Sequence, residues 1–239
     1  MIVIFSNNLI IYGNNEETKA IEVKKTIINN LKFNKEYSNE QIKSISLKNR
    51  SVTLIIEGEE LFIKNIIIPK VSKRYIYYVL RNEITERYGE DVMFSYDIVK
   101  EDKNHYNTVV YCFQENKYSL LKNSSIYNCS GLTIDFIQNS VKDLYSKEIK
   151  DKKYILLFNY RNYIYLLKVK NNILIYNKVI NLLNYNYDEI NDMLKIFIEK
   201  NKNNCNIYSI NLKEYLQNVD NTELSSLTMK KILEYAVVR

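Results

Sequence analysis

The stretch IIIPKVSKRYI, residues 66–76, holds the only proline of this 239-residue chain. A run of β-branched residues reaches Pro69, and a basic stretch with helical spacing begins four residues later. Proline cannot donate to a strand ladder, and it keeps the residue before it extended. Ser72 is a residue type that favours the N-cap of a helix, and Gly89 favours a left-handed stop at its end. We therefore predict a strand over 60–68 and a helix over 73–88.

The rest of the chain alternates between short apolar runs, typical of strands, and amphipathic stretches, typical of helices. Around the proline we predict strands over 51–58, 91–99, 107–113 and 132–137, and helices over 115–127 and 139–147. Farther on we predict two or three antiparallel strands over 154–180 with a turn at Asn171-Asn172, a helix over 187–202, a strand over 206–210 and a closing helix over 224–238. At the start we predict a hairpin of 2–5 and 9–12, then a helical or mixed stretch over 15–30. This order indicates a mixed α/β (α+β) class rather than a regular β-α-β series.

Composition and charge are those of a soluble globular protein. Apolar residues make up 46% of the chain, and no apolar run approaches the roughly 20 residues of a membrane-spanning helix. The net charge is +6, but the basic runs are interleaved with acids, which favours a solvated face over a nucleic-acid stripe. The three cysteines form no C-x-x-C pair, which argues for a reducing compartment and against a disulfide framework or zinc site. We predict a cytosolic protein that binds no nucleic acid.

The sequence contains no motif of a known catalytic or cofactor site. It has no G-x-S-x-G, H-E-x-x-H, Walker or G-x-G-x-x-G pattern, and no pair of carboxylates stands out by its spacing. The single histidine, His105, lies in the polar stretch EDKNHYNT without a nucleophile beside it, which favours a loop residue over a catalytic base. The tyrosine-rich stretch 154–165 alternates as a half-buried strand does and lacks the glycines of an RNA-recognition motif. The residues alone thus predict a soluble binding protein with no catalytic, cofactor or metal residues.

Several stretches nevertheless follow one another in a familiar order. The strand that ends in IIIPKVS is followed by a helix that carries Glu83 and by the acidic-aromatic strand of YGEDVMFSYDIV. CSGLTIDFI comes later, and Tyr235 and Ala236 lie in the last helix. This succession resembles the PilM family, the actin-like cytoplasmic proteins of type IV pilus assembly, which are related to the cytoplasmic part of the secretion protein GspL and more distantly to FtsA. The resemblance is clearest over 51–180.

The resemblance implies a degenerate actin-like, ribonuclease H-like fold. Its first half would comprise residues 1–58 and 131–150, interrupted by a small inserted α+β subdomain at 59–130. The second half would comprise residues 151–239, which are too few for the extra subdomain of full-length relatives.

The sequence departs from the actin-like pattern where nucleotide would bind. Actin-like ATPases hold phosphates with two β-hairpins carrying Asp-x-Gly, because glycine lets backbone N–H groups approach and the aspartate orients the metal. We expect these hairpins at residues 5–8 and 158–162, and neither stretch contains the aspartate or the glycine. The glycine pair that usually holds adenine is also missing, since no glycine follows Gly131. We therefore expect a pseudo-ATPase without a cofactor, the alternative being a divergent actin-like ATP-binding protein.

The resemblance also implies a function and a place in the cell. It implies a scaffold of a type IV pilus or type II secretion-like machine, cytoplasmic and peripheral at the inner face of the cell membrane. Its partners would be the cytoplasmic tail of a PilN-like inner-membrane protein, which would hold it at the membrane indirectly, and the pilus assembly ATPase complex. A third interpretation is a nucleic-acid or membrane-surface binder attracted by the net charge.

The candidate partner site lies on the strands beside Pro69, which are apolar on both faces. A sheet with one wet face should alternate apolar and polar residues. The second face therefore either packs against the body of the protein or lines a groove for an extended apolar peptide, as the resemblance suggests for the PilN tail. The candidate groove residues are Phe62, Ile66, Ile68, Phe94 and Tyr96.

Overall fold

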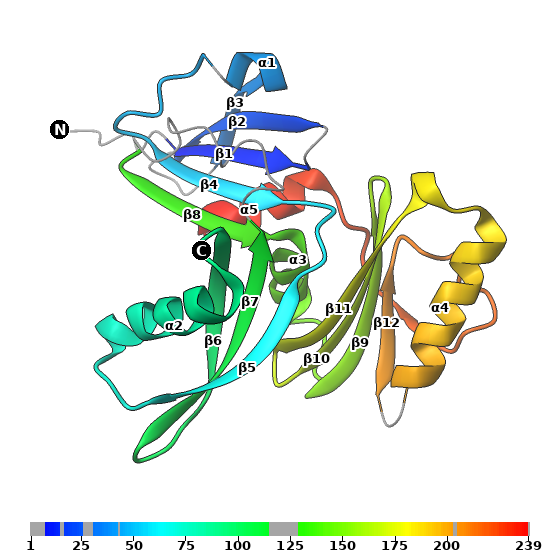
Figure 1. Ribbon diagram of the computed structural model, residues 1–239. Helices are drawn as coiled ribbons and strands as arrows, with labels where there is room; N and C mark the ends of the chain where they lie inside the picture. Colours follow the sequence, from blue (N-terminus) through cyan, green and yellow to red (C-terminus); the bar gives the residue numbers. More distant parts are fainter. Residues whose placement is uncertain are drawn as a thin grey trace. The chain divides into compact units, whose positions relative to one another are not determined.

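The computed structural model of the chain describes residues 8–14, 17–25, 31–42, 44–114, 129–202 and 205–238. They fall into two compact units (Figure 1). Unit 1 comprises Met1–Glu59, Tyr118–Ile149 and Ser226–Arg239, and unit 2 comprises Glu60–Lys117 and Lys150–Ser225. The predicted helix over 115–127 lies outside the described residues, and the four-part division of the chain at 58, 130 and 150 stays a prediction.

Unit 1 is built on a five-stranded sheet in the order β3-β2-β1-β4-β8. Its strands are β1 Asn8–Gly13, β2 Thr18–Lys25, β3 Leu31–Tyr37, β4 Ser51–Ile56 and β8 Gly131–Phe136, and its helices are α1 Asn39–Ile42, α3 Ile137–Tyr145 and α5 Met229–Val238. β1 pairs antiparallel with β2 and parallel with β4, and β4 pairs parallel with β8. The central strands β1 and β4 are buried on both faces, which is why they are continuous apolar runs in the sequence.

The start of the chain differs from the prediction. Residues 9–12 lie in β1, whose two edges pair with β2 and β4, and the other predicted strand of the hairpin, 2–5, lies outside the described residues. The stretch 15–30 contains the strand β2 instead of a helix. Ala20 and Val23 are both in the core although they lie on opposite faces of β2, which pairs with a strand on each edge, and this three-residue spacing imitates helical periodicity.

The larger sheet of unit 2 repeats the strand succession of unit 1. Its order is β11-β10-β9-β12-β13, so the first strand again lies between the second and the fourth. The elements are β9 Lys153–Tyr160, β10 Tyr163–Lys170, β11 Ile173–Asn181, the short 3-10 helix η3 Leu182–Asn184, α4 Tyr187–Asn201, β12 Asn206–Ile210 and β13 Thr222–Glu223. The predicted turn at Asn171-Asn172 is confirmed, with both residues at positive φ. The mixed α+β class is therefore confirmed.

Helix α4 begins with a capping box and covers one face of this sheet. The Asn186 side chain accepts a hydrogen bond from the Glu189 backbone N–H at 3.0 Å, and the Glu189 carboxylate accepts one from the Asn186 N–H at 2.8 Å. The apolar side of α4 packs on β9, β10 and β12, and the core residues it contributes are Ile190, Leu194, Phe197 and Ile198. No helix in the described part of the chain is long and apolar enough to cross a bilayer.

Unit 2 also holds a three-stranded antiparallel sheet in the order β5-β7-β6. Its strands are β5 Phe62–Pro69, β6 Val92–Glu101 and β7 His105–Gln114, and α2 Lys73–Tyr88 packs on one face. β5 ends at Pro69 and α2 ends before Gly89, as predicted, but Gly89, at φ 91° and ψ 174°, does not adopt the left-handed helical conformation of the predicted stop. Ser72 occupies the N-cap position, but its side chain makes no capping hydrogen bond. His105 is the first residue of β7 rather than a loop residue, and its Nε2 lies 2.9 Å from Asp102.

A single amide side chain ties β11 to the chain just before β5. The Leu61 N–H donates to Asn177 Oδ1 at 2.9 Å, and Asn177 Nδ2 donates to the Leu61 carbonyl at 2.7 Å. Both residues are 4% exposed. Asn177 thus satisfies both backbone polar groups of a buried residue more than a hundred positions away in the sequence.

Candidate functional site

The five predicted partner residues lie on the face of the three-stranded sheet that α2 covers. Ile66 and Ile68 are 7% and 2% exposed and belong to one apolar cluster with the buried side of α2. Phe94 and Tyr96 on β6 are partly buried against the same cluster, and Phe62 at the start of β5 is 52% exposed. Ile66 and Ile68 are therefore core residues that a partner would not reach while α2 is in place. The assignment of the five residues to a partner site stays a prediction.

Aromatic side chains of α2 border the accessible part of this face. Tyr77 stacks on Phe94 with ring centroids 4.9 Å apart, and Tyr88 meets Phe62 edge-on at 5.8 Å. Cys112 lies on the central strand β7, between Phe62 of β5 and Phe94 of β6. Burial raises the pKa of its thiol to about 11, so the thiol stays neutral. The thiol adds no charge, but the Lys64 ammonium lies over the Phe62 ring at 4.5 Å. The border is thus aromatic, with one cation beside Phe62. The sequence analysis missed Tyr77 and Tyr88, although both flank the apolar stripe of the predicted helix.

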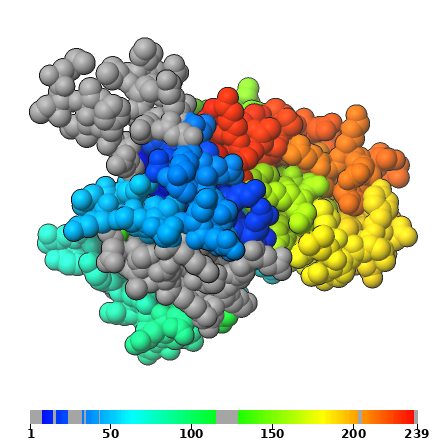
Figure 2. Space-filling view, turned by 90° about the horizontal axis from the view of Figure 1, so that it is seen from above, coloured from blue at the N-terminus to red at the C-terminus, as the bar shows by residue number. Residues whose placement is uncertain are grey.

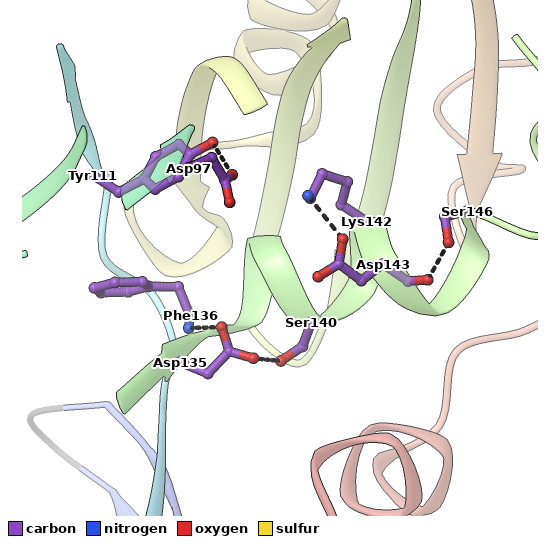
Figure 3. A network of polar contacts seen from close by, with 8 residues as sticks. All are labelled: Asp97, Tyr111, Asp135, Phe136, Ser140, Lys142, Asp143 and Ser146. Carbon is purple, nitrogen blue, oxygen red and sulfur yellow. Dashed lines mark hydrogen bonds and ion pairs between the residues drawn. The ribbon is translucent and has the colours of Figure 1, made fainter. Parts of the chain in front are cut away.

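The opposite face of the three-stranded sheet is buried at its centre and open at one edge. Val109, Tyr111 and Phe113 of β7 are all at most 7% exposed, whereas Ile67 on β5 is 69% exposed. The Tyr111 hydroxyl donates to Asp97 Oδ2 at 2.8 Å, a contact drawn in Figure 3. This bond explains how an acidic residue fits in the apolar alternation of β6.

The two outer strands of this sheet, β5 and β6, each have an edge that pairs with no strand in the described residues. Such an edge can take up an extended peptide as an additional strand. β5 ends at Pro69, which cannot donate, and β6 has a register shift between Ile98 and Lys100. Pro69 and the Asn177–Leu61 bonds bound the part of β5 whose edge remains free, and the register shift lies in the last part of β6, beyond Phe94 and Tyr96.

The turn that corresponds to a first phosphate-binding hairpin is not at residues 5–8, as expected, but between β1 and β2. Asn8 is already the first residue of β1, and the connection reads Gly13-Asn14-Asn15-Glu16-Glu17. Gly13 has φ +142°, and a Cβ there would lie 2.1 Å from the Glu17 carbonyl oxygen, so only glycine fits. This turn therefore does contain a glycine, contrary to the expectation, but it contains no aspartate.

The second turn lies where the sequence analysis expected it, between β9 and β10. It consists of Arg161 and Asn162, with Tyr160 opposite Tyr163. Arg161 adopts φ 54°, a conformation that favours glycine, and its guanidinium lies over the Tyr160 ring at 5.6 Å. The turn thus offers a cation and neither an aspartate nor a glycine.

The carboxyl ends of the parallel strands β4 and β8 hold buried polar residues, the place where open α/β sheets usually bind ligands. Asp135 at the end of β8 is 9% exposed. Its two oxygens accept hydrogen bonds from the Phe136 N–H at 2.9 Å and the Ser140 hydroxyl at 2.7 Å (Figure 3). One turn farther, Lys142 pairs with Asp143 at 2.8 Å. Both oxygens of Asp135 are thus bonded beside the first turn of α3. The described residues contain no cluster of three metal-ligating side chains.

Solved structures share this architecture, although no protein-family model and no curated protein matches the sequence. A chain titled PilM–PilN type IV pilus biogenesis complex is 12% identical with a TM-score of 0.61, over 97% of this chain and 98% of that one. A Bacteroides thetaiotaomicron protein of unknown function with an actin-like ATPase fold is 10% identical. Its TM-score is 0.56, and the match covers 98% of this chain and 99% of that one. The cytoplasmic domain of EpsL, an inner-membrane component of the Vibrio cholerae type II secretion system, is 9% identical. Its TM-score is 0.53, and the match covers 98% of this chain and 96% of that one. The chain therefore has an actin-like fold, as predicted.

Proposed function

We propose that this protein is a cytoplasmic scaffold of a type IV pilus or type II secretion-like assembly machine. The observation that carries the proposal is the likeness, over 97% of the chain, to a structure of the PilM–PilN type IV pilus biogenesis complex. A second neighbour of similar extent, EpsL, is a component of a secretion machine at the inner membrane. The partner would be the cytoplasmic tail of a PilN-like inner-membrane protein, which would hold the scaffold at the membrane. A pilus assembly ATPase is a further proposed partner.

The tail would bind along the accessible part of the three-stranded sheet. Phe62, Phe94 and Tyr96, bordered by Tyr77 and Tyr88, offer apolar contacts beside strand edges that have main-chain groups to share. An added strand gains affinity from main-chain hydrogen bonds and specificity from alternate side chains. This arrangement supports an extended apolar peptide as the ligand.

The test uses a fluorescent synthetic peptide with the cytoplasmic tail sequence of the PilN-like protein encoded in the same genome. Anisotropy should report saturable binding to the full chain, and Phe62→Asp should weaken it about tenfold or more, because it places a charge in an apolar contact. Tyr75→Asp, at another exposed position of α2, is the matched control and should leave the affinity unchanged. No binding of the peptide would contradict the proposed function. Unchanged binding by Phe62→Asp would contradict only the location.

We further expect no functional Mg-ATP site, since neither turn supplies an aspartate to orient the metal. Thermal melts of the protein with and without millimolar Mg-ATP should coincide. A ligand at 100 times its Kd would stabilise the folded state by about 2.7 kcal/mol, which a melt detects readily. A reproducible rise of several degrees together with calorimetric binding would instead favour a divergent actin-like ATP-binding protein.

A further inference from the structure

A pocket lies in unit 2, away from the three-stranded sheet. It is a pocket of about 140 Å³ between α4 and the segment 211–219 that follows β12. The yellow atoms of α4 and the orange atoms of the following segment meet at the surface in Figure 2. For comparison, a cavity of about 150 Å³ in a protein core holds one benzene molecule. The pocket thus has the volume of one large side chain.

The interior of the pocket is apolar. Leu194 and Ile198 line it from α4, and Leu216 and Val219 line it from the facing segment. The first three are at most 6% exposed, so they belong to the core and do not move freely. Burial of an apolar ligand group on them would be favourable by the usual hydrophobic effect.

Two tyrosines close one end and fix the two walls relative to each other. The Tyr187 hydroxyl at the start of α4 donates to the Glu214 carbonyl at 2.7 Å. Its ring stacks on Tyr215 with centroids 5.1 Å apart. Backbone hydrogen bonds from Tyr215 to Leu212 and from Val219 to Leu216 hold the facing segment in turns. The pocket is therefore preformed rather than assembled by a ligand.

The mouth of the pocket carries three carboxamides. Asn191 stands on α4, and Gln217 and Asn218 stand on the facing segment. Their side chains make no hydrogen bond to another residue in the described ranges. Each carboxamide can donate to a carbonyl and accept from an N–H, the two groups that every peptide unit presents. One cation, Lys195, and one anion, Glu214, also line the pocket, so its formal charges cancel.

We propose that this pocket binds an uncharged peptide segment of a partner protein by one aromatic or branched apolar anchor side chain. The anchor would fill the apolar interior against the stacked tyrosines, where offset and edge-on ring contacts are available. The main chain of the peptide would bond to the carboxamides at the mouth. The exposed residues Leu183 and Tyr185, just before α4, would extend the contact beyond the pocket. A buried anchor with polar contacts around it is the usual centre of a peptide interface.

The proposal is tested with model compounds and the isotope-labelled full chain, by NMR titration. N-acetyl-phenylalaninamide should shift the signals of residues 187–198 and 214–219 saturably. N-acetyl-alaninamide keeps the peptide groups but lacks the anchor, and toluene keeps the ring but lacks the peptide groups. The affinity of each should be lower than that of N-acetyl-phenylalaninamide by a factor of about ten or more, because each compound loses one of the two sets of contacts.

Two variants locate the binding. Asn191→Trp places an indole in the mouth of the pocket and should abolish the shifts. Glu199→Trp adds the same group at an exposed position of α4 that does not line the pocket, and it should bind as the parent does. Saturation by toluene as tight as by the amide would overturn the peptide assignment, and absence of saturable shifts with the parent chain would overturn the site itself. The pilus-tail peptide plays no part here, so this outcome and that of the proposed scaffold function are independent.

Discussion

Replacing Asn177 by alanine should lower the free energy of unfolding by about 3 kcal/mol. The substitution leaves the N–H and the carbonyl of Leu61 without their partners, and each buried group that loses its bond costs about 1–3 kcal/mol. Water cannot replace the amide easily, because both residues are 4% exposed. Urea unfolding followed by circular dichroism measures the change as a lower midpoint at unchanged slope.

Lys178→Ala, one position along β11, is the matched control for this measurement. Lys178 is exposed, so its truncation should change stability by about 0.5 kcal/mol or less. A loss of less than 1 kcal/mol for Asn177→Ala would show that the two hydrogen bonds to Leu61 do not hold β11 to the chain before β5. Equal losses for the two variants would lead to the same conclusion.

The strand and the helix beside the single proline were predictable because local chemistry determines both of their ends. Pro69 ends β5 because it lacks an N–H, and Gly89 follows α2 with φ 91°, a value that favours glycine. Ser72 shows the limit of such reasoning. It stands at the predicted N-cap position, yet its side chain makes no capping hydrogen bond. The preference of serine for N-caps thus predicted where the helix begins but not the contact that its side chain makes.

Long-range pairing was not predictable in the same way. The sequence shows that β5 is apolar on both faces, but only the structure shows that α2 covers the face of Ile66 and not that of Ile67. The partner of Asn177 is 116 residues away, and nothing in the sequence singles it out among the many asparagines. In β2, burial on both faces of the strand placed the core residues Ala20 and Val23 three positions apart, which is the spacing of a helix. In each case the deciding contact is distant in the sequence.

The two five-stranded sheets share one strand order but differ in the turns between their first two strands. Both five-stranded sheets keep the same succession of strands, which burial of central apolar runs maintains. The turns that connect the first two strands of each sheet differ in sequence. One keeps only Gly13, which the close approach of Glu17 requires, and the other has Arg161 at positive φ. The same strand order thus goes with two turns of different residues, because a fold does not determine the chemistry of its loops.

Ile66→Asp should destabilise the protein by about 5 kcal/mol at neutral pH, enough to unfold the three-stranded sheet. Ile66 is 7% exposed and packs with the buried side of α2, so the variant loses an apolar contact and buries a carboxylate among apolar side chains. Burial raises the pKa of the introduced carboxyl above its unfolded value, so the folded state binds the proton more tightly. The loss in free energy of unfolding should therefore be largest above that raised pKa and should become smaller as the pH falls through it. Limited proteolysis of β5 to β7 and urea unfolding at pH 7 and pH 4.5 measure both effects.

Ile67→Asp is the control, because it makes the same chemical change one residue away on the same strand. Ile67 is 69% exposed, so the carboxylate stays in water, and stability should change by about 0.5 kcal/mol or less at either pH. The contrast between the two variants depends on the strand register, in which Ile66 lies opposite Thr108 and faces α2. A shift of one residue would exchange the two faces of β5. A large loss for Ile67→Asp with a small one for Ile66→Asp would therefore mean that β5 pairs one residue out of this register, and that Ile67, rather than Ile66 and Phe62, lies on the side of α2.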